Sequence, residues 1–291
     1  MTDFTGTGLA LITPFNEDLS IDFPALERLV NYTIENGVEY FVVLGTTAEN
    51  ATLSEEESEK VIQCIVKANN KRLPLVLGIG GNNTEAIKNK IRTTDTSDFE
   101  AILSVCPYYN KPTQEGIYQH YKAIASATDK KIILYNVPGR TVVNINPETT
   151  LRLANEFSNI IAIKEASPNY LQSNEIIRQK PANFSVISGD DEITVPMTLA
   201  GGKGVISVIG QALPKEFSQM VRFALEHNVS EANKWHYKLM EITRLIYVEG
   251  NPAGVKALLA LKGICKPHTR LPLVEASAEL TAKIKAELDL I

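Results

Sequence analysis

The sequence contains little cysteine, and its three cysteines, Cys64, Cys106 and Cys265, lie far apart without a C-x-x-C or C-x-H pattern. Disulfide scaffolds and structural zinc sites need closer spacings than these. The four histidines also form no H-x-H or H-E-x-x-H pattern. We therefore expect reduced thiols, histidines on the surface or packed between helices, and no metal site.

Positive charge is not in excess either, because 29 Lys and Arg residues stand against 34 Asp and Glu residues. Basic residues do not cluster with interleaved aromatics, which argues against a nucleic-acid partner. No apolar run approaches the roughly 18 residues that a membrane span requires. The first residues lack a basic stretch followed by a long apolar one, so no secretory signal is expected. These absences predict a cytoplasmic protein without a membrane or nucleic-acid partner.

Short apolar runs alternate with longer amphipathic stretches along the chain, which is the pattern of a parallel sheet with crossover helices. Eight runs rich in Val, Ile and Leu are candidate strands: Leu9–Thr13, Tyr40–Leu44, Leu75–Ile79, Ala101–Val105, Ile132–Asn136, Ile160–Lys164, Val186–Ser188 and Gly204–Val208. Helix starts are marked by Asp22, by Ser54 and by Pro147 after Asn146. A doubly wound sheet would show fewer strands and a glycine-rich first turn. The sequence thus predicts a closed (β/α)8 TIM barrel.

Four further helical patterns follow the last candidate strand, at Lys215–His227, Ser230–Tyr247, Pro252–Gly263 and Ser277–Leu288. One of them completes the barrel, and the others form an appendage. No low-complexity linker separates this part, so we expect it to pack on the barrel. The predicted organisation is a catalytic barrel over residues 1–225 and a C-terminal helical extension over residues 226–291.

Barrel active sites lie where the strands end, which makes Lys164 conspicuous, because it follows the apolar run 160–163 and can point into the barrel. A buried ammonium group is costly unless it is paired. Lys164 is therefore either a structural ion pair with Glu165 or Asp190, or an amine nucleophile.

Hydroxyl groups at neighbouring strand ends favour the nucleophile. Tyr135, Tyr109 and either Thr46 or Thr47 are placed to face Lys164, and a chain of hydroxyls can relay protons during carbinolamine formation and dehydration. Each has an ordinary alternative: a tyrosine at a strand end can simply pack, and threonines after a glycine can cap a turn. Arg140, after a Pro-Gly turn, is either an exposed loop residue or a fork for a substrate carboxylate.

Five segments, GTTAEN (45–50), CPYYNKPTQEG (106–116), LYNVPGRT (134–141), AIKEAS (162–167) and SGDDE (188–192), resemble in order the motifs of the dihydrodipicolinate synthase family. The resemblance covers essentially the whole chain. It implies a barrel with a C-terminal helical extension. It also implies a lyase of lysine and diaminopimelate biosynthesis that condenses pyruvate with aspartate 4-semialdehyde to 4-hydroxy-tetrahydrodipicolinate, without a cofactor.

The resemblance also implies roles for individual residues. Lys164 forms the Schiff base, Tyr135 is the general acid and base beside it, and Thr46 links Tyr135 to Tyr109, which comes from a neighbouring subunit. The remaining substrate contacts implied are Thr47 with the pyruvate carboxylate, Arg140 with the carboxylate of the semialdehyde, and the backbone of Ile206 near the lysine. Ala48 departs from the family, which most often has glycine there.

Family members are commonly homotetramers, arranged as dimers of dimers, and many bind lysine as a feedback inhibitor. The residues that fall at positions resembling this allosteric site are Asn50, Ala51, Glu55, Asn82, Glu85 and Tyr108. Glu55 and Ser58 stand where lysine-sensitive enterobacterial members carry histidines, so the resemblance leaves lysine sensitivity open.

Two other functions remain as alternatives. An N-acetylneuraminate or sugar-acid lyase would share the lysine and the tyrosine, and Arg140 argues against it. A catalytically silent barrel that serves as a binding protein is also conceivable, because a fold does not fix a function. The combination of Lys164, Tyr135, Thr46 and Tyr109 argues against such a barrel.

Overall fold

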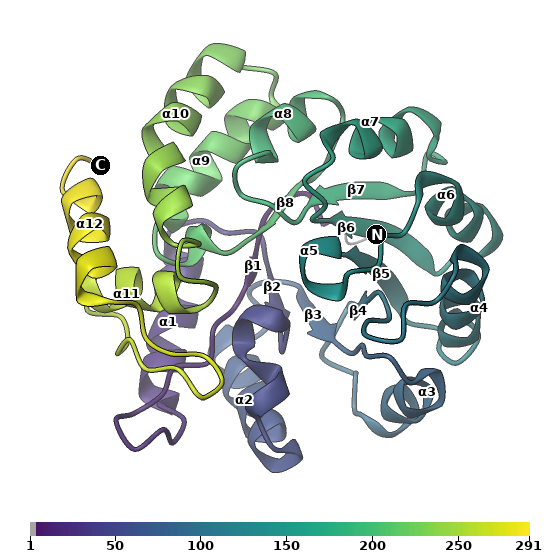
Figure 1. The fold of residues 1–291 in the computed structure, drawn as a ribbon, viewed down its shortest axis with the longest axis horizontal. Coiled ribbons are helices and arrows are strands. Elements are labelled where there is room, and N and C mark those ends of the chain that lie inside the picture. The colour runs from purple at the N-terminus through teal and green to yellow at the C-terminus, as the bar shows by residue number, and fades with distance from the viewer. Residues whose placement is uncertain (1–3) are drawn as a thin grey trace.

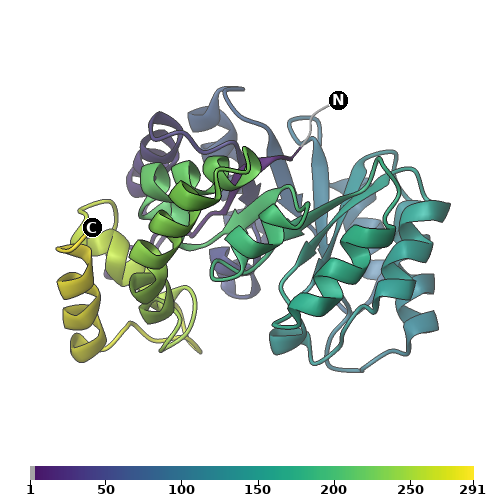
Figure 2. The same cartoon turned by 90° about the horizontal axis from the view of Figure 1, so that it is seen from above.

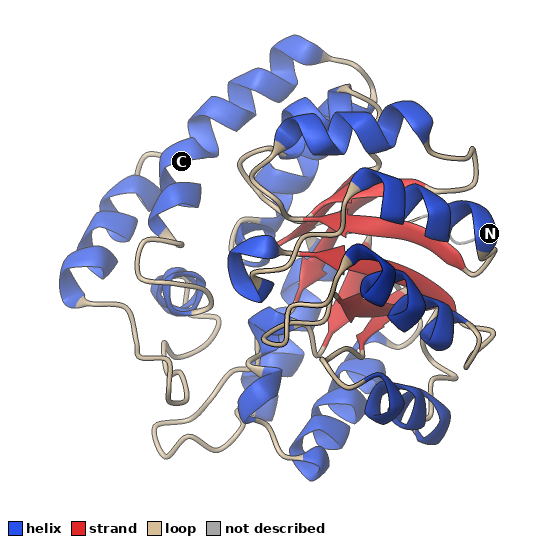
Figure 3. Ribbon diagram, turned by 45° about the vertical axis from the view of Figure 1, so that its right-hand side comes forward, coloured by secondary structure: helices blue, strands red, loops and turns tan. Residues whose placement is uncertain are grey.

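The computed structural model describes residues 4–291 and contains the expected closed barrel, in which each strand pairs in parallel with the next and β8 returns to β1. The strands are β1 (Gly6–Ala10), β2 (Tyr40–Val43), β3 (Leu75–Gly78), β4 (Ala101–Val105), β5 (Lys131–Asn136), β6 (Ile160–Glu165), β7 (Ser185–Ser188) and β8 (Gly204–Ser207). Helices enclose them on all sides, as Figure 3 shows. The predicted fold class is confirmed.

Crossover helices follow every strand. They are α1 (Phe23–Glu35), α2 (Glu55–Asn69), α3 (Thr84–Thr93), α4 (Gln114–Ala125), α5 (Pro138–Thr141), α6 (Pro147–Glu156), α7 (Tyr170–Gln179), α8 (Thr194–Leu199) and α9 (Pro214–Leu225). The predicted helix starts hold: Asp22 accepts from the amide of Ala25, and Ser54 forms a capping box with Glu57. Three short 3-10 turns, η1 (Thr46–Ala48), η2 (Asn50–Thr52) and η3 (Ile209–Gln211), lie at the strand ends.

The first strand begins at Gly6, earlier than the Leu9 expected from the apolar pattern, and ends at Ala10. Its opening residues are small because the barrel leaves no room there: a Cβ on Gly8 would lie 2.2 Å from the ring of Tyr40. Ile12 leaves the ladder because its amide donates to the side chain of Gln211. An apolar pattern cannot show either effect.

The C-terminal extension consists of α10 (Val229–Leu245), α11 (Ala253–Leu261) and α12 (Ala278–Leu288). Figures 1 and 2 show α11 and α12 at one edge of the molecule, beside α10. The segment after α11 turns back to the barrel, where Arg270 pairs with Glu57 of α2 at 2.6 Å. Helix α9 ends at Leu225, and the C-terminal extension contacts the barrel directly.

Side chains fill the barrel interior as one apolar cluster with members from every strand, among them Tyr40, Val76, Leu103, Ile133 and Ile206. Ala162 belongs to this cluster, whereas Ile163 belongs to the layer between strands and helices. Because side chains alternate along a strand, Lys164 shares the inward face with Ala162. The packing thus places one long polar side chain at the upper end of the interior.

None of the helices within residues 4–291 combines the length and the apolar character that crossing a bilayer requires.

The buried histidine of α4 gives the fold a predicted response to acid. His120 lies 2.8 Å from the hydroxyl of Thr84 through Nδ1, and burial lowers its pKa to about 4. The unfolded chain binds this proton near pH 6.5, so stability present above that pH is lost as the pH falls towards 4. We expect His120 to lower the free energy of unfolding by about 2 kcal/mol at pH 5 relative to pH 7.5. Urea unfolding of the wild type and of His120→Gln at both pH values measures this difference. If the stability of the two proteins depends on pH to the same extent, His120 is not its source.

Candidate active site

Lys164 lies in β6 near the carboxyl end of the barrel, and its side chain is only 5% exposed. Tyr135 of β5 stands opposite it in the parallel register. The Nζ atom of Lys164 is 4.4 Å from the centroid of the Tyr135 ring. The two residues that the sequence placed at the centre of the chemistry are therefore adjacent.

The alternative that Lys164 forms a structural ion pair is wrong. Glu165 points to the opposite face of β6, where its carboxylate accepts hydrogen bonds from Asn136, Gln172 and the amide of Ser167. Burial raises the pKa of this carboxyl group, although these hydrogen bonds oppose the shift. Within residues 4–291, Lys164 forms no ion pair with Asp190 or any other carboxylate. Its amine is thus free of a fixed counter-ion.

The lysine side chain needs a glycine beside it. A Cβ on Gly189, which follows β7, would lie 3.0 Å from both Cγ and Cε of Lys164 and 2.7 Å from Cβ of Ala166. Contacts this short do not occur without displacement of one partner. Gly189 therefore provides the space through which Lys164 extends, a role that the sequence analysis did not assign.

The two threonines follow β2 in the turn η1 and differ in environment. Thr47 is buried, and its Oγ1 accepts a hydrogen bond from Nδ2 of Asn251 at 3.0 Å, whereas Thr46 is exposed to the cavity. The residues that flank η1 and η2 make no side-chain cap, so the capping alternative does not explain the pair. Ala48 is buried in the same turn without a positive φ, so alanine fits there without backbone strain.

A cavity of about 450 Å³ opens at this end of the barrel. Thr46, Tyr135 and Arg140 line it, so the structure brings these three predicted residues to one space. Arg140 belongs to the short helix α5 and is exposed, with no ion pair in the described chain. A guanidinium group at the mouth of a largely apolar cavity can bind the carboxylate of a small substrate.

Tyr109 does not join this group. Its side chain is 89% exposed, its backbone has φ of +73°, and the cavity lining does not include it. Tyr108 is the one of the pair that lines the cavity. A single chain therefore does not assemble the predicted relay from Tyr135 through Thr46 to Tyr109.

Ile206 lies in β8, is fully buried and belongs to the same interior cluster as Tyr135. Its backbone takes part in the ladder with β1, opposite Gly8. The structure thus places it inside the barrel with the lysine and the tyrosine.

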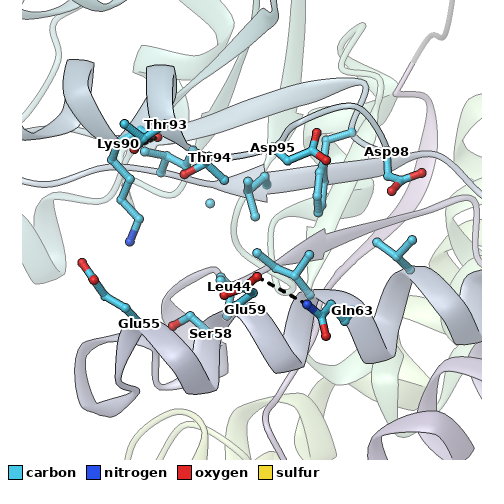
Figure 4. Close-up of a pocket in the computed structure, with 16 residues that line it drawn as sticks. Leu44, Glu55, Ser58, Glu59, Gln63, Lys90, Thr93, Thr94, Asp95 and Asp98 are labelled. Atoms are coloured by element: carbon cyan, nitrogen blue, oxygen red, sulfur yellow. Dashed lines mark hydrogen bonds between the residues drawn. The ribbon is translucent and has the colours of Figure 1, made fainter.

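The predicted allosteric residues fall into separate places. Asn50 and Ala51 line the central cavity with Tyr108, whose carbonyl oxygen accepts from Nδ2 of Asn82 at 3.2 Å. Glu85 forms an ion pair with Lys88 on α3. Glu55 lines a second cavity of about 470 Å³ between α2 and α3, in which Figure 4 shows it facing Lys90. One chain does not bring these six residues to a common pocket.

Sequence reasoning missed the contribution of the C-terminal extension. Asn251 reaches Thr47, and Lys256 of α11 forms a buried ion pair with Glu49 at 2.5 Å. Lysine within the apolar helix 253–261 is a signal that could have been noticed, whereas Asn251 lies in a loop without any pattern.

Groups of three or more His, Cys, Asp or Glu side chains that could hold a metal ion are absent from residues 4–291. The histidines have other contacts: His268 lies 2.5 Å from a carboxylate oxygen of Glu275, and His236 packs against Tyr237.

The fold and the site together define a (β/α)8-barrel protein with a buried lysine and a tyrosine at the carboxyl rim of its barrel. Sequence comparison adds the family, because the sequence model of the dihydrodipicolinate synthetase family matches residues 3–290. The chain belongs to this family, as its motifs indicated.

Curated relatives and solved structures agree. The 4-hydroxy-tetrahydrodipicolinate synthase of Flavobacterium psychrophilum is 58% identical over 284 residues, which are 98% of this chain and 97% of that protein. The enzyme of the same name from Parabacteroides distasonis is 54% identical, over 97% of this chain and 95% of the relative. The crystal structure of dihydrodipicolinate synthase from Thermotoga maritima superposes with a TM-score of 0.96 at 39% identity and covers 99% of both chains.

Proposed function

We propose that this enzyme condenses pyruvate with aspartate 4-semialdehyde through a Schiff base on Lys164 and so forms 4-hydroxy-tetrahydrodipicolinate. The names of the relatives confirm the synthase function expected from the sequence and do not support the sugar-acid lyase. The observation that carries the chemistry is the buried Lys164, which lies beside Tyr135 and has no carboxylate partner among residues 4–291.

The first half of the reaction takes place at the lysine. The neutral amine of Lys164 attacks C2 of pyruvate, and Tyr135 passes protons between the amine and the carbinolamine oxygen until water leaves. Loss of a proton from the pyruvate methyl group then gives an enamine. Thr47 and the backbone of Ile206 hold the pyruvate carboxylate in this assignment.

In the second half, the enamine carbon attacks the aldehyde carbon of the semialdehyde, and the new oxyanion takes a proton. The amino group of the second substrate then attacks the former C2, closes the ring and releases Lys164. Arg140 binds the carboxylate of the semialdehyde, because a guanidinium group at the cavity mouth matches that charge and geometry.

Tyr109 is proposed to act in a neighbouring subunit of a homotetramer built as a dimer of dimers. Its exposed ring, which does not line the cavity of its own chain, supports this assignment. One solved relative, with a TM-score of 0.96 and 39% identity, is described as a monomeric dihydrodipicolinate synthase variant, so assembly needs its own measurement. A fully active monomer in sedimentation experiments would remove Tyr109 from the relay.

We also propose a cytoplasmic location, which suits an enzyme of lysine and diaminopimelate biosynthesis that acts on small-molecule substrates. The six residues that resemble an allosteric site are proposed to come together with their counterparts across a subunit contact, since one chain leaves them apart.

The test is a coupled assay with pyruvate and aspartate 4-semialdehyde, in which added dihydrodipicolinate reductase oxidises NADPH. We expect turnover by the wild type and, for Arg140→Ala, a fall in kcat/KM for the semialdehyde of about 100-fold, because a charged hydrogen-bonded pair is lost. The KM for pyruvate should change little. A wild type that releases pyruvate from N-acetylneuraminate but does not condense the two substrates would contradict the proposal.

A further inference from the structure

The loop between α10 and α11 brings one polar side chain of the extension to the cavity. Asn251 is 9% exposed, lines the cavity and donates from Nδ2 to Oγ1 of Thr47 at 3.0 Å. Its Oδ1 atom is buried without a hydrogen-bond partner in the described structure. A buried side-chain amide whose nitrogen is hydrogen-bonded and whose oxygen has no partner is unusual in a folded protein.

The direction of this hydrogen bond decides what Thr47 can do. A threonine hydroxyl has one hydrogen to donate and two lone pairs to accept with. Because Asn251 donates to a lone pair of Thr47, the single hydrogen of Thr47 remains available for another acceptor. A carboxylate in place of Asn251 would instead attract that hydrogen, since a carboxylate only accepts.

The turn that carries Thr47 is held to the extension by a buried ion pair. Lys256 and Glu49 have side chains that are 0% and 1% exposed and approach to 2.5 Å. Lys256 also donates to the carbonyl oxygen of His268, and Glu49 accepts from the amide of Arg270. From the barrel side, the hydroxyl of Thr13 donates to the carbonyl oxygen of Ala48. The turn is therefore fixed from two sides, and Thr47 faces Asn251 in a defined geometry.

We propose that the C-terminal extension supplies Asn251 as a positioning residue of the active site, which orients the hydroxyl of Thr47 so that it donates to the carboxylate of the 2-oxo acid. The proposal rests on the proposed function, which assigns the pyruvate carboxylate to Thr47. The extension thus acts in substrate binding as well as in packing, through a contact between residues 47 and 251.

Two substitutions separate orientation from packing. In Asn251→Asp, a side chain of nearly the same shape accepts the hydrogen of Thr47, so the KM for pyruvate should rise about 10- to 100-fold while kcat changes less than about threefold. In Asn251→Ala, the Thr47 hydroxyl is released but not redirected, and the KM should rise only about three- to tenfold. A packing role predicts instead that Asn251→Ala raises the KM by the same factor with or without the Thr47 hydroxyl, because the void that it leaves does not depend on that hydroxyl.

The coupling to Thr47 gives a readout that a structural role would not move. Pyruvate binding is measured by borohydride trapping on Lys164 at increasing pyruvate concentration, with folding checked by thermal melting. If Asn251 acts through Thr47, Asn251→Ala should have less than a twofold effect in a Thr47→Val background, since the hydroxyl is already gone. Asn155→Asp, an exposed position on α6, serves as the matched control and should bind pyruvate as the wild type does.

The outcomes are distinguishable. A wild type that traps no pyruvate would remove the proposed function, and the role of Asn251 with it. A wild type that traps pyruvate, together with an Asn251→Ala variant whose KM is normal or whose effect multiplies with that of Thr47→Val, would overturn the role of Asn251 alone. If Asn251→Asp does not fold, the double-mutant cycle of Asn251→Ala with Thr47→Val decides whether Asn251 acts through Thr47.

Discussion

Replacing Lys164 with alanine should lower turnover in the coupled assay by at least about a thousandfold, because no other amine can form the covalent intermediate. Lys164 is buried at the rim of the barrel, beside Tyr135, and no carboxylate in the described part of the chain pairs with it. Pyruvate and borohydride should add a stable adduct to the wild type, detectable by mass spectrometry, and none to the variant.

The control for this result is a second lysine that is also fully buried. Lys256 pairs with Glu49, and burial lowers its pKa, yet it lies in the extension and should not be labelled. An adduct on Lys256, or turnover that survives in Lys164→Ala, would show that the nucleophile has been misassigned.

Replacing Gly189 with alanine should lower kcat/KM for pyruvate by about 100-fold, because the space beside the Lys164 side chain is lost. The added Cβ would lie 2.7 Å from Cβ of Ala166 and 3.0 Å from the Lys164 side chain. Because Cβ of Ala166 cannot rotate away, the backbone after β7 must shift and the Lys164 side chain must yield with it. A displacement near 1 Å can cost about this factor when a nucleophile loses its geometry. The rate of borohydride trapping on Lys164 at pyruvate concentrations well below saturation measures this fall.

Gly81→Ala is the matched control. The nearest atom to its new Cβ would be Cδ1 of Ile87 at 3.7 Å, an ordinary contact. Trapping at the wild-type rate in both glycine variants would mean that Lys164 reaches its reactive position without the space beside Gly189.

These predictions differ in how far the sequence alone supports them. The position of Lys164 follows from two local patterns, the alternation along a strand and the end of an apolar run, and both need only neighbouring residues. The eight strands were predicted for the same reason, with the first one misplaced where glycines took the place of apolar side chains. Tyr135 and Thr46 also follow, because adjacent parallel strands end at the same rim.

The contacts of Glu49 with Lys256 and of Thr47 with Asn251 could not be predicted in this way. They join residues separated by 207 and 204 positions, and neither partner carries a periodic or motif signal that points to the other. The failure of Tyr109 to reach the cavity of its own chain is of the same kind, since it depends on a left-handed backbone turn after β4.

The sequence by itself determined the barrel, the family and the inward lysine, because strand periodicity and local motifs depend on neighbouring residues. Only the tertiary structure decided that Glu165 turns away from Lys164, that Gly189 makes room for it, and that the extension holds the threonine turn. Those relations arise from packing between distant segments, where shape and burial, which no local pattern encodes, select the partner.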